Sequence, residues 1–356
     1  MGMKTVHVIG TGTIGEPLIG MLADMRESLG IDEVTYHKNT PRITDRPKMH
    51  ALHQRGAKLV VDEDAQQGFL EIGVTPELES VEAIDNADVV IDCTPSGIGH
   101  KNKHKYYENF THNTLGFIAQ GSELGFGKMY ARGINDEVFD PDEDRFLQVV
   151  SCNTHNLSVL LKNLALHTGD ETNLVEGRFV CIRRANDISQ GGNFIPAPQV
   201  GSHGDSIYGS HHARDAAELY RTLGYELNLF SSALKLNTQY MHTIWFDIKV
   251  REDVDLDTVY ERLEADNLVS MTHKNMSNLV FSFGRDHGHY GRILNQTVVV
   301  RDTLSVRNGN EIVGFCFTPQ DGNAILSSIA ATVRFLYPDD NYDRIQTLAP
   351  FFFDEV

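Results

Sequence analysis

The chain has 356 residues, which is enough for about two domains of ordinary size. Hydrophobic residues make up 41% and charged residues 22%, as in globular proteins with a large core. The net charge of −18 argues against a nucleic-acid or anionic-membrane surface, so an anionic substrate would need a local basic pocket.

The sequence shows no membrane-targeting pattern and no paired cysteines. No apolar run approaches the ~18 residues of a membrane-spanning helix, and the first residues lack a signal-peptide pattern. The four cysteines are widely spaced and form no CxxC pair. We therefore expect reduced thiols and a cytoplasmic protein that spans no membrane.

The first predicted strand, residues 4–9, leads into a glycine-rich turn. Gly10, Gly12 and Gly15 form a GxGxxG pattern that opens an apolar helix. Glycines permit a tight turn and close approach of a pyrophosphate, which N–H groups at the helix start then bind. This strand–turn–helix context predicts dinucleotide binding, and a ligand-free turn is the alternative.

The second predicted strand, within 33–41, ends without the acidic residue that holds the ribose in many NAD sites. Lys38 stands there instead, followed by Asn39 and Thr40. A cation among small polar groups favours the 2′-phosphate of NADP, although an exposed, solvated lysine would give the same pattern.

Three further strand-like runs follow at 87–95, 114–121 and 146–152, with helical or loop stretches between them. Such alternation predicts a doubly wound parallel sheet of the Rossmann type, in the α/β class. Ligands of these sheets bind beyond the carboxyl ends of the strands. Those ends carry Thr94, Gly121, Ser122 and Cys152.

Cys152 stands where a predicted strand meets a helix, because Leu157, Leu160, Leu161 and Leu164 have the spacing of one helix face. The start of a helix lowers the pKa of a thiol and favours the thiolate. A reactive cysteine is one interpretation, and a small buried side chain is the other.

The pattern changes after residue 170. Long alternating runs at 173–184, 225–237, 240–250, 295–306 and 311–319 predict a mostly antiparallel sheet, with helices near 255–265 and 272–280. This indicates a second, α+β domain. An apolar helix at 323–336 comes last.

Basic residues of this second part are candidate ligands for an anion. Arg183 and Arg184 end a strand-like run, and a long loop then carries His211 and His212. His242 lies in an apolar strand and is either a core residue or the base that a thiolate nucleophile needs. The run at 286–290 (DHGHY) matches no fixed metal-ligand spacing, so we expect no metal.

Together these residues resemble the type II, archaeal-type phosphorylating glyceraldehyde-3-phosphate dehydrogenases. The resemblance runs nearly end to end and depends on GTGTIG, VVIDCTPSGIGHKN, QGSE, VVSCNT, CIRRAND, the HH pair and the MH dipeptide. It implies a Rossmann domain over 1–151, joined by the C-terminal segment 323–356, and a catalytic domain over 152–322. It also implies NADP or NAD as cofactor and a homotetramer.

The resemblance assigns roles residue by residue. It makes Cys152 the nucleophile and His242 the base. It implies cofactor contacts at Thr13, Ile14, Gly121, Ser122, Arg184 and Gln320, beside the glycines, Lys38 and Thr94. It implies contacts to the phosphorylated aldehyde or to inorganic phosphate at Ser151, Asn153, Thr154, Arg183, His211 and His212.

The implied reaction is reversible oxidation of glyceraldehyde 3-phosphate to 1,3-bisphosphoglycerate, as in glycolysis and gluconeogenesis. The sequence departs from the family at Ser122, which replaces a glycine, and at His155 and Asn156, which replace Thr and Gly. Alternatives are another phosphorylated aldehyde or a semialdehyde as substrate, hydrolysis of the thioester, and a catalytically inactive cofactor-binding regulatory protein.

Overall fold

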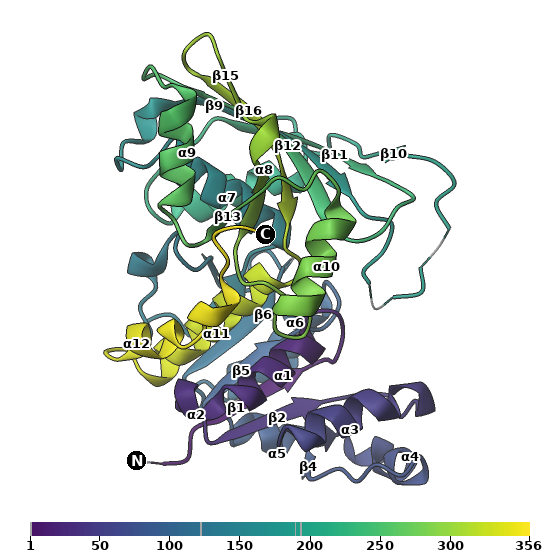
Figure 1. The fold of residues 1–356 in the computed structure, drawn as a ribbon. Coiled ribbons are helices and arrows are strands. Elements are labelled where there is room, and N and C mark those ends of the chain that lie inside the picture. Colours follow the sequence, from purple (N-terminus) through teal and green to yellow (C-terminus); the bar gives the residue numbers. More distant parts are fainter. Residues whose placement is uncertain (1, 122, 189, 193) are drawn as a thin grey trace. The chain divides into compact units, whose positions relative to one another are not determined.

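The computed structural model describes residues 2–121, 123–188, 190–192 and 194–356 (Figure 1). The chain divides into two compact units. Unit 1 comprises 1–128, 139–149 and 325–349, and unit 2 comprises 129–138, 150–324 and 350–356. The expected class, α/β with a Rossmann-type sheet and a second, mostly antiparallel sheet, is confirmed.

The first sheet has the strand order β4-β3-β2-β1-β5-β6-β8-β7. The pairs from β4 to β8 are all parallel. The strands are β1 (Thr5–Ile9), β2 (Glu33–His37), β3 (Lys58–Val61), β4 (Leu78–Glu79), β5 (Val89–Asp92), β6 (Gly116–Gln120), β7 (Lys128–Tyr130) and β8 (Phe146–Val149). The sequence predicted five of these strands and missed the short strands β3, β4 and β7.

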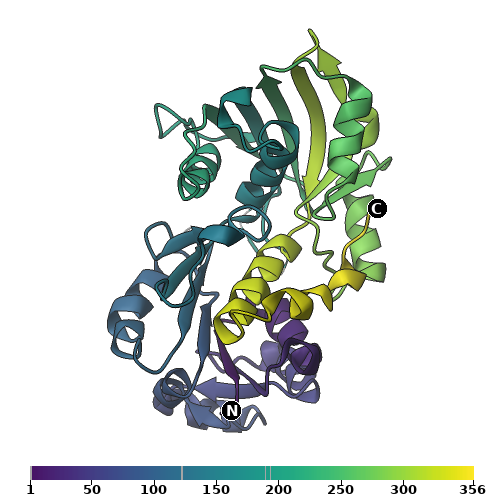
Figure 2. The same cartoon turned by 90° about the vertical axis from the view of Figure 1, so that its left-hand side faces the viewer.

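Helices lie between the strands of unit 1 and in its C-terminal segment. They are α1 (Gly15–Asp24), α2 (Arg26–Leu29), α3 (Arg46–Gln54), α4 (Gln66–Glu71), α5 (Ser80–Asp85), α6 (Ile98–Lys105), α12 (Asn341–Gln346) and, from its fourth residue on, α11 (Gly322–Leu336). In both views α11 (yellow) lies beside β6 (Figures 1 and 2), where Gln120 Nε2 donates to Ser328 Oγ at 2.6 Å.

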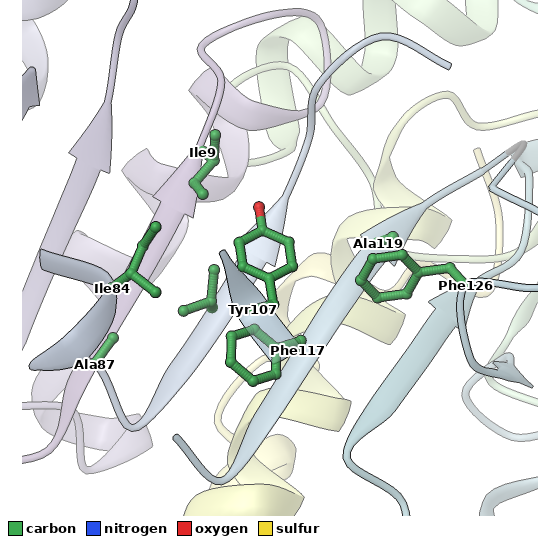
Figure 3. Packing of buried hydrophobic residues seen from close by; sticks show 8 residues of the cluster. Ile9, Ile84, Ala87, Tyr107, Phe117, Ala119 and Phe126 are labelled. Atoms are coloured by element: carbon green, nitrogen blue, oxygen red, sulfur yellow. The ribbon is translucent and has the colours of Figure 1, made fainter. Parts of the chain in front are cut away.

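An aromatic cluster fills part of this core and anchors a strand end (Figure 3). The rings of Tyr107 and Phe117 stack at 5.0 Å, and Phe117 stacks on Phe146 at 5.2 Å. The Tyr107 hydroxyl donates to Asp92 Oδ2 at 2.6 Å, and Asp92 Oδ1 accepts from the N–H of Thr94 at 2.9 Å. The buried tyrosine thus satisfies its polar group while fixing the loop that follows β5.

The second sheet has the strand order β10-β11-β9-β12-β16-β14-β13, with β15 paired to β16. Among the described strands of this sheet, the β11–β9 and β13–β14 pairs are parallel and the others antiparallel. The strands are β9 (Leu174–Arg183), β10 (Gln199–Val200), β11 (Leu229–Lys235), β12 (His242–Val250), β13 (Val269–Thr272), β14 (Thr297–Val300), β15 (Ser305–Arg307) and β16 (Glu311–Thr318). The run predicted at 295–306 is therefore two short strands on either side of a 3-10 turn.

The helices described in unit 2 are α7 (Cys152–Leu164), α8 (His211–Arg221), α9 (Leu256–Glu264) and α10 (Ser277–His287), together with the first three residues of α11. The Tyr220 hydroxyl of α8 donates to the Ser158 carbonyl of α7 at 2.8 Å, which joins the two helices. Short 3-10 turns occupy η1 (Ile43–Asp45), η2 (Glu63–Ala65), η3 (Tyr107–Asn109), η4 (Asp136–Val138), η5 (Glu171–Asn173), η6 (Arg301–Thr303) and η7 (Ala349–Phe351).

Candidate active site

Cys152 is the first residue of α7, as the sequence predicted. Ser151 is extended (φ −66°, ψ 158°) and caps the helix, because its Oγ lies 3.3 Å from the N–H of Thr154. The residues that follow Cys152 in α7 are almost all buried, whereas Cys152 itself is partly exposed. The first N–H groups of a helix have no partner within it, so this thiol lies where an oxyanion could be bound.

His242 lies close to Cys152 through a shared neighbour. It begins β12 and pairs with Thr318, the last residue of β16, so the Gln320 side chain comes beside it. Gln320 Nε2 lies 3.2 Å from His242 Nε2 and 3.5 Å from Cys152 Sγ. Gln320 Oε1 accepts from the backbone N–H of His242 at 3.0 Å. One amide group therefore contacts both members of the predicted nucleophile–base pair.

The other nitrogen of His242 joins a buried polar network. His242 Nδ1 lies 3.0 Å from Asn153 Oδ1, which also accepts from the Thr318 hydroxyl at 3.2 Å. Asn156 Nδ2 donates to Thr318 Oγ1 at 3.0 Å, and Asn156 Oδ1 accepts from the Cys316 thiol at 3.2 Å. Asn156, one of the departures from the family pattern, therefore supports the imidazole from within the core.

Neighbouring charged groups have opposing effects on the pKa of the Cys152 thiol. Burial and the neighbouring Asp321 raise the pKa of Cys152 to about 11, against the lowering effects of Arg184, the Gln320 hydrogen bond and Arg183. The sequence predicted a lowered pKa from the helix start alone. Burial of the sulfur, which was the alternative interpretation of Cys152, disfavours the thiolate, and so does the carboxylate of Asp321, which the sequence did not indicate.

Asp321 and His242 are themselves perturbed. Burial raises the pKa of Asp321 to about 6, although Arg184 and Arg292 act in the opposite direction. Arg292 Nη2 lies 3.6 Å from Asp321 Oδ2. Burial, followed by Arg184, Arg183 and His212, holds the pKa of His242 well below its usual range. The imidazole is therefore neutral at neutral pH and can accept a proton.

Basic groups of unit 2 gather near this pair. Arg184 is buried and donates to Asp187 Oδ1 at 2.6 Å, whereas Arg183 is exposed at the end of β9. His211 and His212 form the first turn of α8, with ring centroids 3.9 Å apart. The prediction that both histidines lie in a loop is wrong, because residues 211–221 have the spacing of an amphipathic helix. Among the described residues, neither ring nitrogen of the buried His212 has a hydrogen-bond partner.

Other predicted substrate residues point inward. Thr154 is fully buried, and its hydroxyl lies 2.9 Å from Ser151 Oγ. Asn153 is 2% exposed and engaged with His242. His155 is also fully buried, with Nδ1 3.0 Å from the Ser151 carbonyl oxygen. The His155 side chain is therefore enclosed and bonded to the residue that caps α7.

The glycine-rich turn of unit 1 has the geometry that a dinucleotide requires. Gly10 has a φ of +99°, and a Cβ on Gly15 would lie 2.0 Å from the Gly10 carbonyl oxygen. A Cβ on Gly12 or Gly121 would meet nothing within 4 Å. The space over Gly12 is thus open at the start of α1, next to Thr13 and Ile14, and among the described residues no side chain caps that helix. These features fit a bound pyrophosphate.

The predicted 2′-phosphate ligand Lys38 has a carboxylate beside it. Lys38 Nζ lies 2.6 Å from Asp45 Oδ2, and Lys48 Nζ lies 3.9 Å from Asp45 Oδ1. Lys48 also lies 3.2 Å from Glu16 and donates to the Thr11 carbonyl of the glycine-rich turn at 3.3 Å. Lys48 and Asp45 were not predicted, although an acidic residue three positions before a lysine at the start of a helix was a usable signal.

The remaining residues predicted to contact the cofactor are described unit by unit. Thr94 follows β5, and its backbone and side chain both donate to Asp92. Gly121 has a φ of +66°, and its carbonyl accepts from Gln148 at 2.8 Å. Ser122 lies outside the described residues. Arg184 and Gln320 belong to unit 2, and Gln320 contacts the thiol and the imidazole.

No group of three or more His, Cys, Asp or Glu side chains is placed to hold a metal ion in the part of the chain that the structure describes. No helix among the same residues combines the length and apolar character needed to cross a membrane.

Comparison with known proteins gives one consistent set of relatives. The chain is 26% identical over 353 residues to a glyceraldehyde-3-phosphate dehydrogenase of Methanobacterium formicicum, covering 95% of this chain and 96% of that protein. It is 29% identical over 271 residues to one of Methanobacterium bryantii, covering 73% and 72% of the two chains. A relative from Metallosphaera sedula is 28% identical over 323 residues, covering 87% and 86%. No protein-family model matches the chain. The resemblance seen in the sequence motifs is confirmed.

Proposed function

We propose that this distant homologue of the archaeal glyceraldehyde-3-phosphate dehydrogenases oxidises glyceraldehyde 3-phosphate to 1,3-bisphosphoglycerate, with inorganic phosphate and NADP⁺ or NAD⁺. The observation that carries the proposal lies within one unit. Cys152 at the start of α7 and the neutral His242 are both bonded to the amide of Gln320, with Arg184 close enough to influence both.

Covalent chemistry begins at the sulfur. Cys152 Sγ adds to the aldehyde carbon, and the carbonyl oxygen takes up the proton that the thiol loses, which gives a thiohemiacetal. N–H groups at the start of α7 stabilise the negative charge that develops on this oxygen. When bound, the nicotinamide cofactor supplies the hydride acceptor.

His242 is the base of the oxidation. Its low pKa keeps Nε2 unprotonated, so it accepts the thiohemiacetal hydroxyl proton as the carbon is oxidised to a thioester. Inorganic phosphate then attacks the thioester carbonyl, the C–S bond breaks, and Cys152 leaves as a thiolate. The thiolate then takes up the proton held by His242, so the products are the acyl phosphate and the enzyme with its thiol and neutral imidazole restored.

A basic cluster supports phosphate as the second substrate. Arg183 is exposed, and the charges of Arg183 and His211 act on the buried His212. His212 offers ring nitrogens that have no partner among the described residues. Because Arg and His donate to phosphate oxygens, this cluster offers an anion a set of hydrogen bonds in an otherwise acidic protein.

His155 and Asn156, which differ from the family pattern, are buried, and this favours glyceraldehyde 3-phosphate as the substrate. His155 and Asn156 bond to the Ser151 carbonyl and to Thr318 in the core. Substitutions that face the core alter the support of the site, whereas a change of substrate needs altered side chains on the pocket surface. We therefore retain glyceraldehyde 3-phosphate over other phosphorylated aldehydes.

The test is reduction of NADP⁺ and of NAD⁺ by the purified protein with glyceraldehyde 3-phosphate, with and without inorganic phosphate. Phosphate-dependent reduction supports the proposal. Phosphate-independent reduction replaces phosphorolysis by hydrolysis. Reduction only with erythrose 4-phosphate or a semialdehyde overturns the substrate, and no reduction with any of these aldehydes overturns the enzymatic proposal.

A further inference from the structure

Gln320 is placed to act on the reacting atoms themselves. It lies two residues beyond β16, is 8% exposed, and its single side-chain nitrogen lies 3.5 Å from Cys152 Sγ and 3.2 Å from His242 Nε2. The family resemblance implies only a cofactor contact for this residue. The described contacts link it to the nucleophile and the base.

The orientation of the amide follows from its neighbours. Gln320 Oε1 accepts from the backbone N–H of His242 at 3.0 Å, so the group facing Cys152 and His242 is the NH₂ group. An amide NH₂ carries two hydrogens and no acceptor. One hydrogen can therefore point to Cys152 Sγ and the other to His242 Nε2, and each of these atoms must be the acceptor.

The hydrogen bond at Nδ1 determines which ring nitrogen of His242 carries the proton. Asn156 donates to Thr318 Oγ1, so the Thr318 hydroxyl proton is directed to Asn153 Oδ1. Asn153 Oδ1 has no hydrogen and must also accept from His242 Nδ1. The proton of the neutral ring is thus on Nδ1, and the lone pair on Nε2 faces the Gln320 amide.

We propose that Gln320 is a further catalytic residue, whose amide NH₂ group stabilises a Cys152 thiolate beside a neutral His242 by donating one hydrogen bond to each. This role rests on the proposed function of Cys152 as nucleophile. A donor to the sulfur favours the charged thiolate, and a donor to Nε2 opposes protonation of the ring. As Sγ adds to the aldehyde, the thiol proton passes to the carbonyl oxygen while the Gln320 amide stabilises the negative charge on the sulfur, so His242 stays available as base for the thiohemiacetal hydroxyl.

Other charged groups act on the same atoms and must be separated from Gln320. Asp321, next in the chain, raises the pKa of Cys152, whereas Arg184 and Arg183 lower it. Arg184, Arg183 and His212 face His242. Gln320 differs from these groups because it carries no charge and acts at contact distance, so its removal changes the thiol without changing the net charge.

The experiment measures the alkylation rate of Cys152 by iodoacetamide from pH 7 to 9, without cofactor or aldehyde. A Cys93→Ser background leaves Cys152 as the one partly exposed thiol among the described residues, since Cys181 and Cys316 are buried. The Gln320→Met variant keeps the size of the side chain and removes the donor. We expect its thiol pKa to rise by about 1 to 2 pH units, which slows alkylation roughly 10- to 100-fold at fixed pH.

A second variant keeps the test decisive if Gln320→Met fails to fold. Gln320→Glu retains an acceptor for the His242 backbone N–H, adds a negative charge, and should slow alkylation at least as much. Gln199→Met, on the exposed strand β10 of the same unit, is the matched control and should alkylate at the parent rate.

The outcomes separate this role from the proposed function. If both Gln320 variants fold and alkylate at the parent rate, Gln320 does not act on the thiol and the inference is wrong. That result would leave the proposed function intact, because the dehydrogenase assay measures it independently. A slow Gln320 variant supports the inference whichever aldehyde the enzyme oxidises.

Discussion

Replacing Asp321 by asparagine should stabilise unit 2 above pH 6. The Asp321 carboxyl is 6% exposed, and burial raises its pKa from the ordinary 3.8 to about 6 even though Arg184 and Arg292 oppose the rise. The folded chain therefore holds this proton more tightly than the unfolded chain does. Asparagine has the shape of the protonated carboxyl and carries no charge at any pH.

The size of this stability difference follows from the linkage between proton binding and unfolding. Below pH 4 both folded and unfolded wild-type chains are protonated at this position, so the variant and the wild type should be equally stable. Between pH 4 and pH 6 only the unfolded chain releases the proton, and wild-type stability falls by about 1.4 kcal/mol per pH unit. Above pH 6 the difference levels off at about 3 kcal/mol in favour of Asp321→Asn.

The assay uses the single tryptophan, Trp245, which lies on β12 of the same unit. Its fluorescence reports urea unfolding of wild type and Asp321→Asn at pH 4, 5, 6, 7 and 8. A stability difference that grows between pH 4 and 6 and is then constant fits the burial of this charge. A variant that is less stable than wild type at pH 8 would show that the charge is satisfied by its arginine neighbours and would refute the reasoning.

Three further outcomes are expected. His242→Asn should lower the rate strongly and remove the acid limb of the pH–rate profile, since no base remains to be protonated; an unchanged profile means another base. Lys38→Gln and Lys48→Gln should each weaken NADP⁺ binding about 10-fold by calorimetry and NAD⁺ binding far less, whereas Lys58→Gln on β3 should change neither; equal losses for both cofactors contradict a 2′-phosphate contact. Asn156→Ala should lower the free energy of unfolding by about 2 kcal/mol in urea, because Thr318 and Cys316 lose buried partners, and an unchanged midpoint would show that the network adds no stability.

The sequence predicted those parts of the fold that depend on local pattern. The apolar runs that end at Ile9 and Asp92 became parallel strands, and the leucines after Cys152 form one face of α7, whose start places the thiol at the strand–helix junction. These features depend on residues close in the chain, which the hydrophobic period and the glycine turn report directly.

Features set by tertiary contacts were missed. The pKa of Cys152 depends on Asp321, 169 positions away, and on its own burial, neither of which a local motif encodes. The hydrogen-bond partners of His242 come from α7 and from the residue that follows Pro319, so they became visible only when the second sheet brought β12 and β16 together. The helix at His211 was hidden because two histidines at its start read as part of a polar loop.

The most direct test of the account is whether Cys152 carries the acyl group. The intact protein is mixed with glyceraldehyde 3-phosphate and NADP⁺ or NAD⁺ in phosphate-free buffer and analysed by mass spectrometry, with Cys152→Ser as control. The account predicts one phosphoglyceryl adduct per chain on Cys152, lost when inorganic phosphate is added and absent from Cys152→Ser. Cofactor reduction by wild type together with full reduction by Cys152→Ser, or an adduct on another residue, would contradict it.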